Sequence, residues 1–151
     1  KARLNPTTSV LTLAYEGARA KPKRVLFAEG EEEVVLRAAI AFKEGGYGTP
    51  VLVGRDDVPD RLRALGVTDP ESYELHNSRH SPLVPAMVDF LYTRLQRRGF
   101  LRRDCERMIN QDRNIFGSVM LQMGEADVMI TGVTRTYAQT MREVRRVIDP
   151  A

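Results

Sequence analysis

The sequence contains one cysteine and no tryptophan, and none of its apolar runs approaches the length that would span a membrane. The single thiol, Cys105, cannot form an internal disulfide, and with no signal peptide in view we expect a cytoplasmic protein. Walker and GxGxxG motifs, the GxSxG of hydrolases and zinc-ligand signatures are also missing. The best-defined nucleotide-binding, hydrolase and zinc-binding classes are therefore excluded as sources of function.

A strong excess of either charge is missing as well. The 23 Lys and Arg residues against 20 Asp and Glu residues give a net charge of +3. This small excess is compatible with phosphate-bearing small molecules, and we expect neither a nucleic-acid nor a membrane partner. The 151 residues suffice for one domain or for one lobe of a larger protein. Because the chain begins with Lys and ends just after a predicted helix, we expect a fragment of a longer protein.

Short apolar runs alternate with helical patterns, as in proteins built on a parallel sheet. The runs predict strands at 25–28, 50–53, 73–75 and 128–131. Helical spacing predicts helices at 5–20, 34–42, 59–65, 81–98, 102–110, 114–123 and 137–148. The expected fold is α/β, a three-layer αβα lobe with a mostly parallel sheet of about four strands. We expect residues 1–22 to be a lead-in helix and linker from an upstream domain, and residues 23–151 to be the lobe.

Two of these helices have an apolar face that predicts how they pack. On the second helix the face consists of Val34, Val35, Ala38, Ala39 and Phe42. On the last helix it consists of Tyr137, Met141, Val144 and Ile148. We expect both faces to be buried against the sheet.

The rest of the chain is organised around the strand–turn–helix segment from Gly124 to Ile148. Its apolar run is typical of a strand covered on both faces, and Gly132 ends the run. The following loop presents its N–H groups at a helix N-terminus, where the helix dipole favours an anion. Ligands of open α/β sheets bind at the carboxyl ends of the strands, where this loop lies. The simpler alternative is an ordinary strand-to-helix connection with a threonine cap.

Candidate residues for binding a phosphate or an acyl-CoA gather at this loop. They are Glu29, Thr131, Gly132, Thr134, Arg135, Thr136 and Arg142. Arg135 can turn outward from the loop, and Arg142 could reach back along the helix toward its N-terminus. In the competing interpretation the two arginines pair with acidic residues such as Asp127 or Glu143 and only stabilise the lobe.

Three other polar clusters have simpler explanations. Residues 31–33 are glutamates in the first turn of a helix. Their carboxylates interact favourably with the helix dipole there, and this explanation is preferred to a role in acid–base catalysis. His76 and His80 have a spacing that a metal could use on a helix, but Pro82 and the turn residues indicate a loop, so no metal site is expected. The arginine-rich stretch 94–107 could be a phosphate or RNA surface. Its interleaved acids and lack of aromatics favour a solvated helix face.

Several motifs resemble phosphate acetyltransferases, in the order in which those enzymes have them. The motifs are FAEGE at 27–31, VLRAA at 35–39, PVLVG at 50–54, FGSVM at 116–120 and GEAD at 124–127. The resemblance covers most of the chain. It implies a lobe like those of isocitrate and isopropylmalate dehydrogenases, as phosphate acetyltransferases have.

A closer resemblance is to the phosphate-acetyltransferase-like C-terminal domain of the large bacterial NADP-dependent malic enzymes. It is carried by RDCERMIN at 103–110, ITGVTR at 130–135 and VRRVID at 144–149. True acetyltransferases usually have His where this chain has Arg135, Thr at Tyr137 and Asp at Gln139. Thr140 and Arg142 match them. These departures disfavour transferase chemistry and leave ligand binding as the expected role of the loop.

The resemblance implies a regulatory domain of a malic enzyme, with acetyl-CoA or a related acyl-CoA as the effector that inhibits the upstream malate-oxidising domains. NADP and a divalent metal are implied for those domains and no cofactor for this chain. The family's main catalytic residues lie in a second lobe that would follow Ala151, so the chain alone is expected to be inactive. The resemblance also implies a homo-oligomer. The alternatives are half of a catalytic phosphate acetyltransferase, or a lobe kept for oligomerisation.

Overall fold

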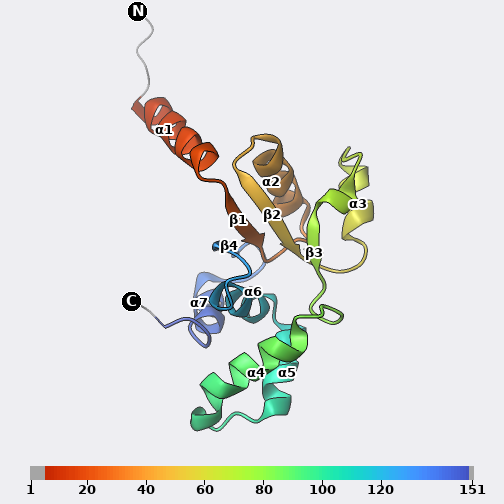
Figure 1. Ribbon diagram of the computed structural model, residues 1–151, viewed down its shortest axis with the longest axis vertical. Helices are drawn as coiled ribbons and strands as arrows, with labels where there is room; N and C mark the ends of the chain where they lie inside the picture. The colour runs from red at the N-terminus through yellow and green to blue at the C-terminus, as the bar shows by residue number, and fades with distance from the viewer. Residues whose placement is uncertain (1–5, 150–151) are drawn as a thin grey trace, which may run out of the picture.

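The computed structural model describes residues 6–149, in which a four-stranded parallel sheet has helices on both sides (Figure 1). The strands are β1 (Lys23–Phe27), β2 (Gly48–Val53), β3 (Glu74–His76) and β4 (Val128–Ile130), in the order β3-β2-β1-β4. The α-helices are α1 (Pro6–Ala20), α2 (Glu33–Glu44), α3 (Val58–Ala64), α4 (Val84–Leu95), α5 (Arg102–Gln111), α6 (Arg113–Gln122) and α7 (Tyr137–Val144). Two short 3-10 helices are η1 (Pro70–Ser72) and η2 (Gln96–Arg98). The predicted α/β fold is confirmed.

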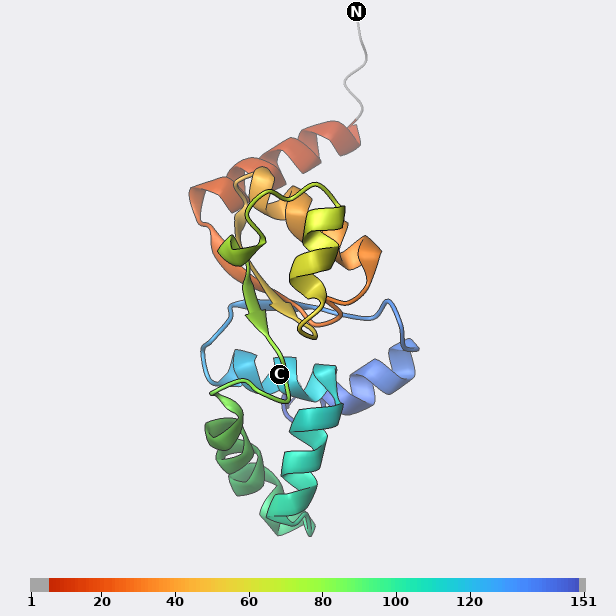
Figure 2. The same ribbon diagram turned by 90° about the vertical axis from the view of Figure 1, so that its right-hand side faces the viewer.

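Each face of the sheet has its own apolar core, because successive side chains of a strand point to opposite faces. Val25 and Phe27 of β1 pack with buried residues of α2 and α3. Leu26 of β1 and Val51 of β2 pack with buried residues of α4, α5 and α6. Figures 1 and 2 show α6 between the sheet and the α4–α5 pair, with α2 and α3 beside the sheet. The sheet is thus the middle layer of three.

The two inner strands lie where their apolar runs predict them. β1 pairs in parallel with both β2 and β4, and β2 pairs with β3. β1 and β2 approach so closely at Gly48 that a Cβ there would lie 2.1 Å from the carbonyl oxygen of Lys23. Glycine alone allows this approach. Because all these pairings are parallel, the carboxyl ends of the four strands lie at one edge of the sheet, where the loops gather.

The prediction that β4 is covered on both faces is wrong. β4 is an edge strand, and 45% of Val128 and 49% of Ile130 remain exposed. Met129 points to the opposite face and packs against α6, where a Cβ on Gly117 would meet its sulfur at 2.6 Å. An apolar run of three residues does not distinguish an edge strand covered on one face from a central strand.

Of the predicted apolar face of α7, only Ile148, which follows the helix, packs against the core. Tyr137 is 78% exposed and Met141 is only partly buried, whereas Thr140 and Glu143 are buried. Val147, just after the helix, joins the core. Glu143 turns inward because Asn114 of α6 donates a hydrogen bond to it at 2.7 Å, which a local apolar pattern cannot reveal.

The face of α2 was predicted only in part. Val35 and Ala39 are buried as expected, but Val34 is 63% exposed and Ala38 is exposed. Leu36, which the prediction left out, is fully buried. The buried stripe is therefore turned by one residue from the predicted one.

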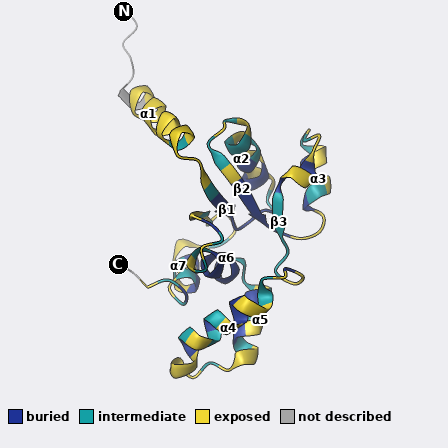
Figure 3. Ribbon diagram, in the orientation of Figure 1, coloured by how far each residue is buried: buried dark blue, intermediate teal, exposed yellow. Residues whose placement is uncertain are grey.

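Helix α1 projects from the lobe, and its residues from Thr8 to Ala20 are exposed except for the half-buried Ala18 (Figures 1 and 3). It contacts the α2–β2 turn through Tyr15, which stacks on Tyr47 with ring centroids 5.1 Å apart. Arg19 adds a hydrogen bond to the carbonyl of Gly45. The predicted start of this helix at Asn5 lies outside the described residues. That α1 leads in from an upstream domain stays a prediction.

Candidate functional site

The loop after β4 is held by the carboxylate of Glu29, which lies two residues after the end of β1. Glu29 is 2% exposed. Its Oε2 accepts hydrogen bonds from the N–H groups of Gly132 at 2.9 Å and Val133 at 2.7 Å. Its Oε1 accepts from the N–H of Thr134 at 2.8 Å and from the Thr134 hydroxyl. The neighbouring strands β1 and β4 thus bring together two predicted candidates that are about a hundred residues apart in sequence.

These bonds keep the Glu29 carboxylate ionised. Burial raises the pKa of Glu29, but the hydrogen bonds from the Thr134 hydroxyl and the three N–H groups outweigh burial and hold the pKa below its usual value. The N–H groups that the sequence offers to a ligand therefore already bind an anion that belongs to the chain. A phosphate at this point would have to displace Glu29.

Arg135 points inward. Its guanidinium forms ion pairs with Asp112 at 2.9 Å and with Glu143 at 2.5 Å. Burial lowers the pKa of Arg135, but the bonds to the two carboxylates raise it further, so the side chain stays charged. Glu143 also accepts a hydrogen bond of 2.7 Å from Asn114, and its pKa lies below its usual value because these bonds outweigh burial. The ion pair between Arg135 and Glu143 is the one that the competing interpretation expected, in which the arginine stabilises the lobe.

The remaining loop candidates also bond within the lobe. Thr131 donates its hydroxyl to the side-chain oxygen of Asn114. Thr136 is the N-cap of α7, and its hydroxyl accepts from the N–H of Gln139 at 3.4 Å. The threonine cap of the simpler interpretation is therefore present. Whether any of these residues contacts a ligand stays a prediction.

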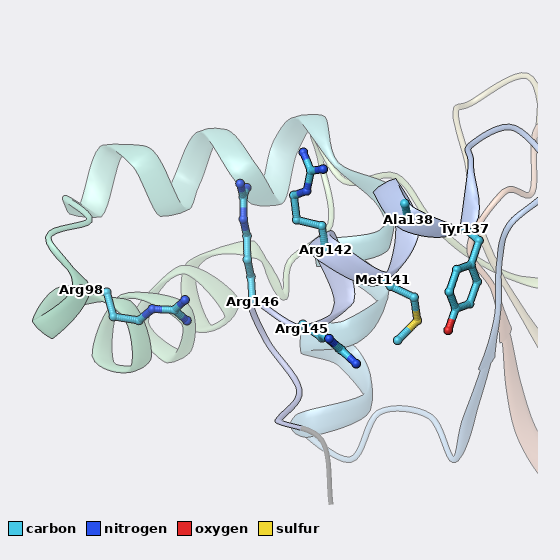
Figure 4. Close-up of a pocket in the computed structure, with 7 residues that line it drawn as sticks. All are labelled: Arg98, Tyr137, Ala138, Met141, Arg142, Arg145 and Arg146. Atoms are coloured by element: carbon cyan, nitrogen blue, oxygen red, sulfur yellow. The ribbon is translucent and has the colours of Figure 1, made fainter.

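Arg142 lies apart from the loop, in a pocket of about 520 Å³ formed by α7, the turn after it and η2 (Figure 4). We call it the four-arginine pocket. Its lining residues are Arg98, Tyr137, Ala138, Met141, Arg142, Arg145 and Arg146. Within residues 6–149 no carboxylate oxygen forms an ion pair with any of the four arginines. The pocket therefore has a concentration of positive charge that the described part of the lobe does not neutralise.

Three different segments provide the walls of the four-arginine pocket. Arg142 lies on α7, and Arg145 and Arg146 follow in the next turn. In Figure 4 Arg142 and Arg146 extend in the same direction, and Arg98 reaches toward them from η2. The exposed ring of Tyr137 and the side chain of Met141 supply an apolar side. Arginines spaced by three and four positions are the local signal that could have identified 145 and 146 along with 142.

The other polar clusters form bonds within the lobe. His76 hydrogen-bonds to Glu74 at 2.8 Å and to Ser81 at 3.3 Å. Over residues 6–149 no group of three or more His, Cys, Asp or Glu side chains is placed to hold a metal. In the arginine-rich stretch, Arg102 pairs with Asp89 and Arg107 with Asp104, as expected of a solvated helix face. Over the same described range, no helix combines the length and apolar character that a membrane crossing requires.

Comparison with known sequences gives a consistent result. The pattern of the family described as phosphate acetyl/butaryl transferase matches residues 9–151. An NADP-dependent malic enzyme of Rhizobium meliloti is 45% identical over 99% of this chain, and a probable NADP-dependent malic enzyme of Rickettsia prowazekii is 36% identical over 99%. The chain spans only 20% of the length of either protein.

Comparison with solved structures supports the same fold. A phosphotransacetylase from Streptococcus pyogenes superimposes with a TM-score of 0.81 at 28% sequence identity. The match covers 91% of this chain and 43% of the phosphotransacetylase. The described lobe therefore corresponds to somewhat less than half of that protein.

Proposed function

Because the chain belongs to the phosphate acetyl/butaryl transferase family, we propose that it is the acyl-CoA-binding regulatory domain of an NADP-dependent malic enzyme. Acetyl-CoA, or a related acyl-CoA, binds to this domain and inhibits the oxidation of malate to pyruvate. That reaction takes place in the domains upstream, which use NADP and a divalent metal. Support comes from the identity of 45% and 36% to two malic enzymes over 99% of this chain.

The four-arginine pocket is the observation that carries this proposal. An acyl-CoA has a 3′-phosphate and a pyrophosphate, so it presents several anionic oxygens next to an adenine ring. Guanidinium groups bind phosphate oxygens in a bidentate manner, and four of them line the pocket. Tyr137, 78% exposed, offers its ring face to the adenine or to the apolar arm. In this proposal Arg142 contacts phosphate, together with Arg98, Arg145 and Arg146.

The loop residues position this pocket. Glu29 fixes the backbone of 132–134, and Arg135 ties the loop to Asp112 and Glu143. The first residue of α7, Tyr137, follows this loop directly, so the loop determines where the pocket wall begins. A wall held in place before the ligand arrives loses less entropy on binding. Of the predicted site residues, Arg142 is thus the ligand contact and the others are positioning residues.

Arg135 disfavours the alternative of a catalytic phosphate acetyltransferase. It occupies the position where the acetyltransferases usually have His, and it is charged and bonded to two carboxylates. Such a guanidinium cannot accept a proton at neutral pH. We further propose that the domain contributes to a homo-oligomer and contacts the upstream domains.

The proposal is tested by acetyl-CoA inhibition of malate oxidation in the full-length enzyme. We expect the double change Arg142→Ala and Arg145→Ala to raise the inhibition constant about tenfold to a hundredfold, with activity in the absence of acetyl-CoA unchanged. Arg103→Ala on α5 is the matched control, since it removes an exposed arginine outside the pocket. An enzyme that acetyl-CoA does not inhibit, or that forms acetyl phosphate from acetyl-CoA and phosphate, would overturn the proposal.

A further inference from the structure

A second cleft, of about 340 Å³, lies where β1, β2 and β3 end and where α5 passes into α6. We call it the strand-end cleft. Its lining residues are Glu31, Val53, Gly54, Arg55, Asn77, Ser78, Arg79, Asn110, Gln111 and Arg113. None of them lines the four-arginine pocket. The strand-end cleft is therefore a separate place, at the edge of the sheet where α/β proteins bind ligands.

The charges of the strand-end cleft favour a dianion. Three arginines, Arg55, Arg79 and Arg113, face a single carboxylate, that of Glu31. Glu31 forms ion pairs with Arg55 at 3.2 Å and with Arg113 at 3.3 Å, so it holds two guanidinium groups in place without neutralising all three. Two positive charges remain, which match the charge of a phosphomonoester dianion.

Two buried polar atoms in the lining lack a partner. Nη1 of Arg113 and the side-chain oxygen of Asn110 have no hydrogen-bond partner within the described residues. Buried polar atoms are nearly always hydrogen-bonded, to protein, to water or to a ligand. The guanidinium nitrogen needs an acceptor, and the amide oxygen needs a donor. A ligand with both an anionic oxygen and a hydroxyl group would satisfy the two atoms together.

The neighbouring bonds fix the segments around the cleft. Asn77 donates its amide to Asp56 at 2.9 Å and accepts from the N–H of Arg79 at 3.0 Å, which fixes the loop after β3. Ser78 donates to the carbonyl of Asn110 at 3.1 Å, which fixes the end of α5 against that loop. Arg79 has no ion-pair partner among residues 6–149, so its charge is available.

From these contacts we infer that the strand-end cleft binds a small phosphomonoester that also carries a hydroxyl group. The phosphate lies against Arg79 and Arg113, with Arg55 at its side, and the hydroxyl donates to Asn110. This inference does not rest on the acyl-CoA proposal, since the two sites have no lining residue in common.

The test is calorimetric titration of the full-length protein with glycerol 3-phosphate, in the presence of saturating acetyl-CoA. We expect binding that is about tenfold to a hundredfold weaker in Arg79→Gln and in Arg113→Gln, because each change removes a charged hydrogen bond. Arg103→Gln, an exposed arginine outside both sites, should bind as the unchanged protein does. Because Arg113 pairs with Glu31, its variant could lose stability; Arg79→Gln breaks no ion pair and keeps the test decisive.

Methyl phosphate, which lacks the hydroxyl, should bind several-fold more weakly than glycerol 3-phosphate, since the oxygen of Asn110 then lacks its donor. Equal affinity for the two phosphates would overturn the assignment of the hydroxyl. Absence of any binding at millimolar glycerol 3-phosphate, or equal affinity in Arg79→Gln and in the unchanged protein, would overturn the inference as a whole.

Discussion

The loop after β4 and the four-arginine pocket adjoin along α7, but they differ in whether their anion-binding groups already have an anionic partner within the described chain. The loop has the features that sequence analysis associates with anion binding, and its N–H groups are bonded to Glu29. The pocket has no such motif, and its four guanidinium groups pair with no carboxylate in the described chain. A favourable place for an anion is thus not by itself a ligand site. What matters is whether the protein has already supplied the anion.

The largest effect should come from removing that internal anion. Glu29→Gln replaces one of the two carboxylate oxygens by an NH2 group, which cannot accept from the loop donors, and it removes the negative charge, so we expect the free energy of unfolding to fall by about 3 kcal/mol. Chemical denaturation of the chain measures the change. Glu106→Gln on the exposed side of α5 is the control and should shift stability by less than about 0.5 kcal/mol. If the two variants were equally stable, Glu29 would not hold the loop.

A somewhat smaller loss should follow Arg135→Ala. The change leaves Glu143, 7% exposed, without its guanidinium partner, so we expect about 2 kcal/mol less stability. Acetyl-CoA affinity of the full-length enzyme should fall by less than the tenfold or more expected for Arg142→Ala, because Arg135 positions the pocket wall but does not line the pocket. A large loss of affinity at unchanged stability would make Arg135 a ligand contact, as the loop interpretation predicts.

The inner strands could be predicted from the sequence more fully than β4 and α7 could. The continuous runs of β1 and β2 predict strands because both faces of an inner strand are buried. The same argument fails for β4, because it is an edge strand and the face that carries Val128 and Ile130 stays exposed. On α7 the buried Glu143 finds its partners at Asn114 and Arg135, and the first of these is 29 positions away. Periodicity carries no information about such distant partners.

The candidate site shows the same limit. Glu29 and Thr134 could be predicted as members of one site, because both follow strands that a parallel sheet brings together, and the structure shows a hydrogen bond between them. That the Glu29 carboxylate occupies the loop N–H groups could not be predicted from the sequence. Arg98 was placed with a solvated cluster, because its approach to Arg142 depends on how η2 packs beside α7.

Low pH should remove the stability that the Glu29 carboxylate contributes through its bonds to the loop. Because the folded-state pKa of Glu29 lies below its usual value near 4.5, its contribution to stability is complete above that value. The contribution is lost as the pH falls through the folded-state pKa. The stability difference between the unchanged chain and Glu29→Gln should therefore narrow as the pH drops below about 4.5, in denaturation series at several pH values. A difference that stays constant down to pH 2 would contradict this origin of the stability.

Salt should give the smallest effect and should act on the pocket alone. The four arginines lie at the surface, so counter-ions screen their attraction for phosphate. We expect the dissociation constant of acetyl-CoA to rise about fivefold between roughly 0.05 M and 0.5 M sodium chloride. The stability lost in Glu29→Gln should not depend on salt, because the Glu29 contacts are buried. Affinity that is insensitive to salt would mean that the arginines do not contact the phosphates.

The central claim is that Arg142 in the four-arginine pocket, and not the loop, contacts the ligand. Its most direct test is the dissociation constant of acetyl-CoA for the full-length enzyme, measured by calorimetry for the unchanged protein, Arg142→Ala and the control Arg103→Ala. The account predicts that Arg142→Ala weakens binding about tenfold to a hundredfold at unchanged melting temperature, and that the control has no effect. Equal dissociation constants for the unchanged protein and Arg142→Ala would contradict it.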